Sequence, residues 1–269
     1  MMPLGSFQVC SHPSRKMQAE LDSAAKLARE LGVFLNVHLS ESGAQLADDP
    51  MEALSLAGAF RGKLIVDHAI HLSSKEIGVL ARSGARVAHN PASNMRLASG
   101  IFPMATMVAE GVKIGLGLDG GTNDTGNMFS NMRAAVGLQR AVHRSPSFSP
   151  TVVEVLRMAT LGGAEVLGIE DRTGSLTPGK EADIIVLDPR RANFYPVLDP
   201  LSQIVFSGEP ENVAYVFVAG KLLKDAGMVQ YSDVHGLLQA TQRAAERIRP
   251  WIRTGERAQD DSRKLADGK

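Results

Sequence analysis

The sequence has only one cysteine, Cys10, so an internal disulfide is excluded and a reducing, cytoplasmic location is expected. It also has no excess of either charge. The 29 Lys and Arg residues balance the 29 Asp and Glu residues, so nothing favours nucleic acid or an anionic membrane as a partner. No apolar run approaches the ~18 residues of a membrane-spanning helix, and the first residues lack a secretion signal. With 269 residues, 44% of them hydrophobic, the chain can build a substantial globular core.

Helical and extended patterns alternate along the first two-thirds of the chain. Short apolar runs predict strands at 33–38, 64–68, 85–89 and 112–119. Periodic spacing and capping signals predict helices at 21–31, 51–60, 73–84, 104–110, 127–143 and 151–167. Strands that alternate with helices favour a parallel sheet.

The ends of the four predicted strands carry His38, His68, His89 and Asp119, which lie 30, 21 and 30 positions apart. This spacing is close to the ~31 residues per unit of an eight-stranded β/α barrel, in which the carboxyl ends of the strands carry the chemistry. We therefore predict an α/β fold that forms part of a TIM-like (β/α)8 barrel.

The pattern changes near residue 172. A turn-rich stretch at 174–180 precedes an apolar strand at 182–188, and residues 213–223 are typical of a hairpin. We predict a partial barrel over 1–172, a small accessory β-sandwich segment over 173–230, and a C-terminal helix with a charged tail over 231–269.

A glycine pattern at 115–120 matches the dinucleotide-binding fingerprint G-x-G-x-x-G. That fingerprint requires an acidic residue about 20 positions later for the ribose, and no acidic residue lies between Asp124 and Glu154. It would also place the carboxylate of Asp119 against a pyrophosphate. A nicotinamide-binding protein is therefore disfavoured, and Asp119 is better explained as the end of a barrel strand.

The strand-end residues form a set suited to metal chemistry. His38 begins the motif His-x-x-Glu, so its imidazole can bind a metal while Glu41 leans over the same site. Asp67 and His68 end the next strand, and Asp119 ends the last. Such a cluster favours Zn²⁺ or Fe²⁺ and the activation of a water molecule.

These motifs resemble the amidohydrolase superfamily, and most closely its deaminase and chlorohydrolase branch, which includes guanine, adenosylhomocysteine and triazine hydrolases. The resemblance runs over about residues 5–225 and is carried by the stretches 38–41, 67–72, 89–97, 117–120, 159–164 and 174–183. It implies a metal-dependent hydrolase of carbon–nitrogen bonds other than peptide bonds. The substrate would be a small heterocyclic amine of the purine, pyrimidine or triazine type.

The resemblance also implies a role for each residue. His38 and Asp119 would ligate the metal, and Asp119 would also accept the proton of the attacking water. Glu41 would carry a proton from that water to the leaving nitrogen, and His68 would orient the attacking hydroxide. His89 is expected either to contact the substrate or to brace the loop 90–100, and Asn94 is a further candidate for substrate contact. His71 is expected to be structural, and His12 is treated as a surface residue.

The family's first barrel strand carries His-x-His, and this chain has no two histidines two positions apart. By this resemblance the chain is expected to be truncated at its N-terminus and to contain about strands 4–8. Residues 1–10 would be the remnant of strand 4. It would lack two of the ligands that an intact site uses to hold one metal ion, and its activity would be impaired. The alternative is an inactive fragment that needs a partner to complete the barrel, and pairing of two copies into a homo-oligomer is a further possibility.

Overall fold

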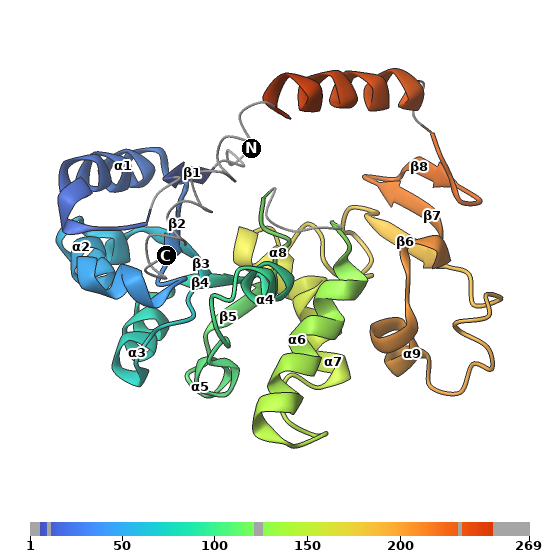
Figure 1. Cartoon of the computed structure of the whole chain (residues 1–269), viewed down its shortest axis with the longest axis horizontal. Helices are drawn as coiled ribbons and strands as arrows, with labels where there is room; N and C mark the ends of the chain where they lie inside the picture. Colours follow the sequence, from blue (N-terminus) through green and yellow to red (C-terminus); the bar gives the residue numbers. More distant parts are fainter. Residues whose placement is uncertain (1–5, 10–11, 121–125, 231–232, 250–269) are drawn as a thin grey trace, which may run out of the picture.

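A computed structural model describes residues 6–9, 12–120, 126–230 and 233–249 of the chain. Five parallel strands form one sheet in the order β1-β2-β3-β4-β5. Their bounds are β1 Ser6–Val9, β2 Phe34–Leu39, β3 Lys63–His68, β4 Arg86–His89 and β5 Lys113–Leu116. Sequential parallel strands joined by helices form an arc of a β/α barrel, as the sequence predicts (Figure 1).

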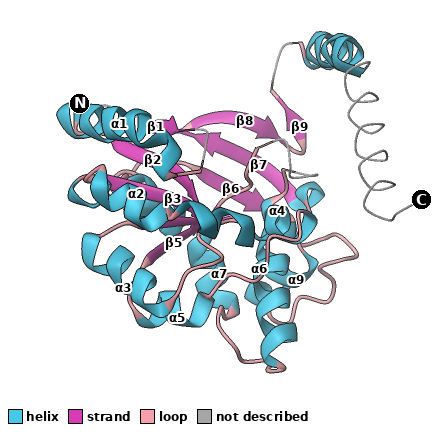
Figure 2. Ribbon diagram, turned by 60° about the vertical axis from the view of Figure 1, so that its left-hand side comes forward, coloured by secondary structure: helices cyan, strands magenta, loops and turns pink. Residues whose placement is uncertain are grey.

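Short helices and 3₁₀ turns connect the strands (Figure 2). They are η1 Arg15–Met17, α1 Gln18–Leu31, η2 Gly43–Asp48, α2 Pro50–Leu56, η3 Ala59–Arg61, α3 Ser74–Ser83, α4 Pro91–Arg96, α5 Met104–Ala109, α6 Met128–His143, α7 Val152–Met158 and α8 Leu161–Leu167. The predicted start and stop signals operate in α3, where Ser73 and Glu76 form a capping box and Gly84 ends the helix with a φ of 72°. Glycine adopts this left-handed conformation without steric cost.

The two faces of the sheet differ in burial. In β2, Leu35, Val37 and Leu39 are buried in the main core, which they share with the helices. The alternate residues, including Asn36 and His38, are only half-buried. Successive strand residues point to opposite faces, so the helices cover one face and His38 lies on the other.

The predicted helix at 151–167 is two helices, because the chain breaks at Thr160 between α7 and α8. The break allows α8 to lie directly against β5. A Cβ at Gly162 would lie 2.6 Å from the carbonyl oxygen of Ile114, and a Cβ at Gly115 would lie 2.8 Å from Cα of Gly163. The glycines therefore permit contact between two backbones that larger residues would separate.

Two other predicted elements are shorter than expected. The helix predicted at 51–60 ends at Leu56, because Gly58 turns the chain with a φ of 65°. The strand predicted at 112–119 has ladder bonds only over Lys113–Leu116. Asp119 lies beyond it with a φ of 63°.

The accessory region is a four-stranded antiparallel sheet in the order β6-β7-β8-β9. Its elements are β6 Ile184–Leu187, α9 Pro200–Ser207, η4 Pro210–Asn212, β7 Val213–Val218, β8 Lys221–Asp225 and β9 Met228–Val229. The predicted hairpin is present, with its turn at Ala219 and Gly220, which both have positive φ. Arg133 of α6 bonds the Gly208 carbonyl and pairs with Glu209 at 2.9 Å, which ties this region to the barrel arc.

Residues 234–249 form the predicted C-terminal helix, which lies apart from both sheets in Figures 1 and 2. The predicted charged tail beyond 249 lies outside the described residues. Among the helices that the structure describes, none is long and apolar enough to cross a membrane. The domain boundaries at 172 and 230 stay predictions.

Candidate metal centre

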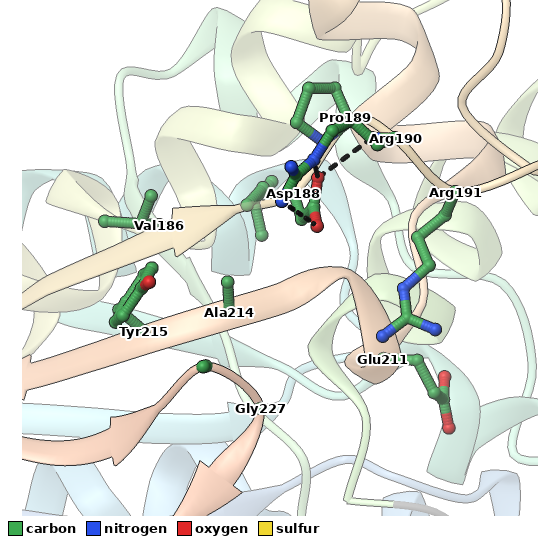
Figure 3. Close-up of a pocket in the computed structure, with 11 residues that line it drawn as sticks. Val186, Asp188, Pro189, Arg190, Arg191, Glu211, Ala214, Tyr215 and Gly227 are labelled. Atoms are coloured by element: carbon green, nitrogen blue, oxygen red, sulfur yellow. Dashed lines mark hydrogen bonds and ion pairs between the residues drawn. The ribbon is translucent and has the colours of Figure 1, made fainter.

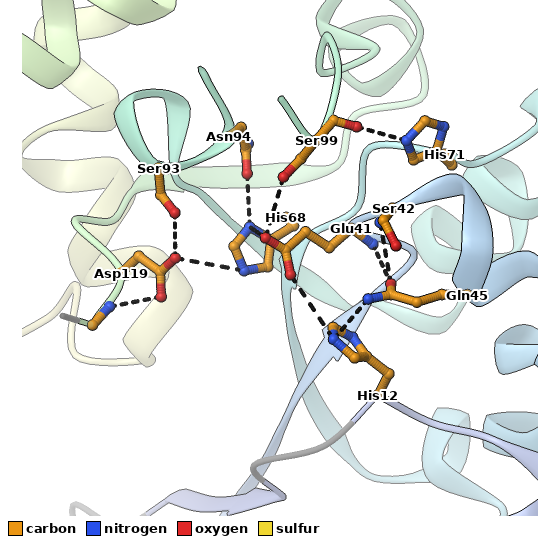
Figure 4. Close-up of polar contacts among 11 residues, drawn as sticks. His12, Glu41, Ser42, Gln45, His68, His71, Ser93, Asn94, Ser99 and Asp119 are labelled. Atoms are coloured by element: carbon orange, nitrogen blue, oxygen red, sulfur yellow. Dashed lines mark hydrogen bonds and ion pairs between the residues drawn. The ribbon is translucent and has the colours of Figure 1, made fainter. Parts of the chain in front are cut away.

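Three side chains meet at the carboxyl ends of β2, β3 and β5. His38 and His68 each offer a ring nitrogen and Asp119 a carboxylate oxygen, and these three atoms all lie within 4.8 Å of one another. Figure 4 shows His68 and Asp119 with the residues that contact them. Carboxyl ends of parallel strands gather at one edge of a sheet, so residues distant in the sequence converge there. The predicted convergence of His38, His68 and Asp119 is therefore present in the structure.

His68 reaches this site through an unusual backbone conformation. The strand register pairs Leu39 with His68 and His38 with Asp67. Simple alternation would therefore send the His68 side chain toward the helices, as it does that of Leu39. Instead His68 has a φ of 68°, which is rare outside glycine, and its ring lies 5.1 Å from the ring of His38. Such strained backbone conformations concentrate at functional sites.

Two residues of helix α4, Ser93 and Asn94, orient two members of the cluster. Asn94 Oδ1 lies 2.8 Å from His68 Nδ1 and accepts its proton, which leaves Nε2 facing Asp119 Oδ2 at 3.9 Å. Ser93 donates to the same Asp119 oxygen at 2.5 Å, and the Gly120 amide donates to the other oxygen at 2.6 Å. Ser93 and Asn94 are buried. The orientations of His68 and Asp119 are thus set by neighbouring groups.

Glu41 follows β2 and lies beside the cluster. Ser99 Oγ donates to Glu41 Oε1 at 3.2 Å, and the same oxygen is 3.9 Å from His68 Nδ1. His71 donates from Nε2 to the Ser99 carbonyl at 2.6 Å and so helps to hold this loop, in line with its expected structural role. Glu41 therefore lies beside His68, and its role in proton transfer stays a prediction.

His12 is also part of the site, which corrects its treatment as a surface residue. Its Nε2 is 2.6 Å from Gln45 Nε2 and 3.9 Å from Glu41 Oε2, and its ring meets that of His38 edge-on with centroids 5.8 Å apart. A usable signal was present in the sequence. His12 follows the first short strand, and the carboxyl end of a parallel strand is where such sites form.

The predicted substrate residues His89 and Asn94 are both buried, at 3% and 1% exposure. His89 stacks on Phe102 with ring centroids 4.3 Å apart, and burial lowers its pKa to about 3, with a smaller contribution from His68. Asn94 bonds His68. Substrate contact by either residue stays a prediction, and their observed contacts are with the protein.

The chemistry of the donor set fits a metal ion. Burial, followed by the charges of His68 and His12, lowers the pKa of His38, which favours the neutral imidazole that ligates metals. His38 Nδ1 and His68 Nε2 are buried, and neither has a hydrogen-bond partner among the described residues. An unpartnered buried imidazole nitrogen is costly unless something else satisfies it, and a cation would do so.

Asp67, the neighbour of His68 in β3, is buried and differs from Asp119. Burial is the main cause that raises its pKa to about 6; the charge of His68 opposes this rise and the charge of Asp119 adds to it. Its register partner is His38. It therefore adds less negative charge to the site near neutrality than a solvated aspartate would.

Two of the three glycines in the rejected nucleotide fingerprint, Gly115 and Gly117, have a packing role here. A Cβ at Gly117 would overlap Oδ1 of Asn90, and Gly115 faces Gly163.

A pocket of about 430 Å³ is found elsewhere, between Asp188, Arg191 and Tyr215 of the accessory region (Figure 3). None of its lining residues belongs to the metal-binding cluster.

The amidohydrolase family model matches residues 8–223. The chain belongs to the amidohydrolase family. The resemblance predicted from the motifs and the barrel fold are thereby confirmed.

Named relatives of this amidohydrolase are deaminases. It is 37% identical over 238 residues to a 5-methylthioadenosine/S-adenosylhomocysteine deaminase of Desulforudis audaxviator, covering 86% of this chain and 55% of that protein. It is 33% identical to a 5'-deoxyadenosine deaminase of Methanothermobacter thermautotrophicus, over 85% of this chain and 55% of that protein. The amidohydrolase chain thus spans about half the length of the curated relatives it matches.

Solved structures with the same fold contain zinc. An adenosine deaminase from Xanthomonas campestris with bound zinc superposes with a TM-score of 0.81 at 31% identity, over 87% of this chain and 55% of that one. An atrazine chlorohydrolase from Arthrobacter aurescens complexed with zinc gives a TM-score of 0.78 at 26% identity, over 84% and 51%. Together with the cluster, these structures support a metal cofactor for this amidohydrolase.

Proposed function

We propose that this chain carries part of the active site of a metal-dependent aminohydrolase that removes an amino group from a purine-type ring. The observation that carries the proposal is the convergence of His38, His68 and Asp119, with Glu41 beside them. The names of the relatives favour an adenosine derivative modified at its 5' position as substrate. The wider substrate class implied by the resemblance also includes amines of pyrimidine and triazine rings.

The donor atoms divide into two roles. His38 and Asp119 would hold the ion, with further ligands supplied from outside this chain. A bound divalent ion lowers the pKa of water toward about 7 and so supplies a nucleophile near neutrality. Zinc is the ion that the solved relatives contain, and iron is the alternative with similar ligands.

The remaining residues would move and direct protons. Because His68 donates a hydrogen bond from Nδ1–H to Asn94 Oδ1, Nε2 has a lone pair with which to orient the attacking water. Asp119 would accept one proton from that water. Glu41 would carry the other proton of that water to the departing nitrogen. The water oxygen would bond the ring carbon as the C–N bond breaks, so that ammonia leaves, a carbonyl remains and the proton held by Asp119 ends on the adjacent ring nitrogen. Proton transfer by a positioned carboxylate contributes ~10²–10⁴-fold to the rate.

The experiment is a direct assay of the purified chain. Protein loaded with zinc is mixed with 5'-methylthioadenosine, and ammonia and bound metal are both measured. We expect ammonia release in the wild type, and E41Q should lose the activity while keeping the zinc. If the wild type binds zinc and releases no ammonia, catalysis by this chain alone is wrong.

A second candidate function follows from the open sheet. In the described residues β1 and β5 are edge strands of the parallel sheet, so the arc does not close. The chain would then be one part of an enzyme that becomes active only when other strands complete the barrel, and a second copy is one source of such strands. Specific activity that rises with chain concentration supports assembly between copies, and constant specific activity contradicts it.

Location and partners belong to the same proposal. The expected partner is the small heterocyclic substrate rather than a nucleic acid or a membrane. A cytoplasmic setting would suit an enzyme with one cysteine that acts on a nucleoside.

A further inference from the structure

The side chain of Gln45 is oriented by two backbone amides. Gln45 lies in η2, and its Oε1 accepts from the Glu41 amide at 2.7 Å and from the Ser42 amide at 3.3 Å. Rotating the side-chain amide by half a turn would place its NH₂ group against these two N–H donors. The hydrogen-bond network therefore assigns the oxygen of Gln45 to the loop and its nitrogen to the opposite side.

This orientation fixes the proton of His12. The Gln45 nitrogen lies 2.6 Å from His12 Nε2. An amide nitrogen only donates, so Nε2 must accept, and a neutral His12 ring carries its proton on Nδ1. The Nδ1 atom is buried and has no hydrogen-bond partner among the described residues.

The choice of tautomer affects Glu41. His12 Nε2 is 3.9 Å from Glu41 Oε2. With a proton on Nε2, His12 would be a donor beside that carboxylate and would weaken it as a base. When Nε2 instead accepts a hydrogen bond from Gln45, His12 has no N–H facing Glu41. The oxygen of the same Gln45 side chain accepts from the backbone amides of Glu41 and Ser42.

We propose that Gln45 is a positioning residue that fixes His12 with its proton on Nδ1, so that His12 does not donate to Glu41. This role rests on the proposed function of Glu41 as the proton carrier. The protonated nitrogen of a neutral imidazole gives a ¹⁵N resonance well separated from that of the bare nitrogen. The proposal can therefore be read without substrate and without catalysis.

The experiment uses the full chain, labelled with ¹⁵N at histidine, freed of metal with a chelator and held near pH 8, where an ordinary imidazole is neutral. H12N identifies the His12 resonances by their loss. In the wild type we expect the protonated nitrogen of His12 to be Nδ1. In Q45E one carboxylate oxygen still accepts from the loop and the other now accepts from His12, so Nε2 should become protonated.

Gln239 provides a matched control, because its Nε2 lies 2.7 Å from Nε2 of the exposed His235. Q239E should leave the His12 resonances unchanged. A wild-type His12 protonated on Nε2 overturns the proposal, and so does a Q45E ring that keeps its proton on Nδ1 alone. If Q45E does not fold, Q45L replaces it, and loss of the Nδ1 preference is then the expected result. Because these outcomes do not depend on ammonia release, they are distinguishable from failure of the proposed function.

Discussion

Asn94 Oδ1 accepts a hydrogen bond from Nδ1 of His68 at 2.8 Å, so the other ring nitrogen, Nε2, faces Asp119. His68 is fully buried, and its left-handed backbone is held partly by the Ala69 amide, which bonds the Leu39 carbonyl at 2.9 Å. The side chains around a metal site are commonly oriented in this way by hydrogen bonds to neighbouring groups. The geometry of the cluster therefore depends on a neutral amide outside the set of three donor residues.

Replacing Asn94 with leucine should lower ammonia release by the zinc-loaded chain by ~10–100-fold, because His68 loses the acceptor that fixes the ring proposed to orient the water. Zinc should still bind, because His38 and Asp119 are the proposed ligands. The chain should tolerate this change, because Asn94 Nδ2 is buried and has no hydrogen-bond partner among the described residues. Ammonia release measures the activity, titration against a zinc-binding dye measures the affinity, and circular dichroism checks the fold. Q242A, on the exposed helix over 234–249, is the control and should match the wild type in both. Unchanged activity in folded N94L would contradict this role.

Removing the carboxylate of Asp119 should abolish the stabilisation of the chain by zinc. A ligand that binds only the folded state at ~100 times its dissociation constant contributes about 2.7 kcal/mol to the free energy of unfolding. Thermal unfolding with and without excess zinc should therefore show a rise in Tm for the wild type and none for D119N. D22N removes an exposed carboxylate on α1 and should keep the rise. A D119N chain that still gains stability from zinc would show that the ion binds elsewhere.

The convergence at the site could be predicted from the sequence because it follows from topology. Alternating strands and helices give a parallel sheet, and the carboxyl ends of its strands bring His38, His68 and Asp119 to one edge. The left-handed φ of His68 could not be predicted, since the sequence Asp67-His68 shows no glycine or turn signal. The strand before His12, Ser6–Val9, has only four residues, so its pattern is weak, and the position of His12 just after it is the signal that the sequence offers.

The close contact between the backbones of α8 and β5 could not be predicted from the sequence pattern. Residues 151–167 have the periodicity of one helix, and the pair Gly162-Gly163 is the only local feature that is compatible with a close approach. The structure shows that this pair lets α8 contact β5, at the cost of a break at Thr160. The packing of α8 against β5, which is distant in the chain, determines where the helix breaks, and local helix propensity does not.

Gly162 and Gly137 should respond oppositely to alanine. A Cβ at Gly162 would lie 2.6 Å from the Ile114 carbonyl, so G162A should push α8 from β5 and destabilise the chain by ~1–3 kcal/mol. Gly137 lies within α6 with nothing within 4 Å of the added Cβ. G137A should therefore stabilise the chain by ~0.5–1 kcal/mol, through helix propensity alone. Urea unfolding measures both, and an equal loss in the two variants would refute the close-contact explanation.

Acid should destabilise the chain through His89. Burial lowers the pKa of this residue to about 3, so the folded state keeps it neutral while the unfolded chain protonates it near pH 6.5. The stability that the neutral ring contributes is complete above pH 6.5 and is lost as the pH falls toward 3. Linkage sets the loss at about 2 kcal/mol between pH 7 and pH 5, provided the unfolded pKa is ordinary.

Replacing His89 with phenylalanine keeps a ring against Phe102 and removes the titrating group, so the stability of H89F should fall less over the same pH range. The comparison uses urea unfolding of metal-free protein at pH 7 and pH 5. H143F is the matched control, because His143 also stacks on an aromatic ring, that of Phe148 at 3.7 Å, but is exposed on α6. H143F leaves the buried His89 in place, so it should keep the wild-type loss. If H89F and H143F lose the same free energy, the acid sensitivity arises from other groups and His89 is not kept neutral by its burial.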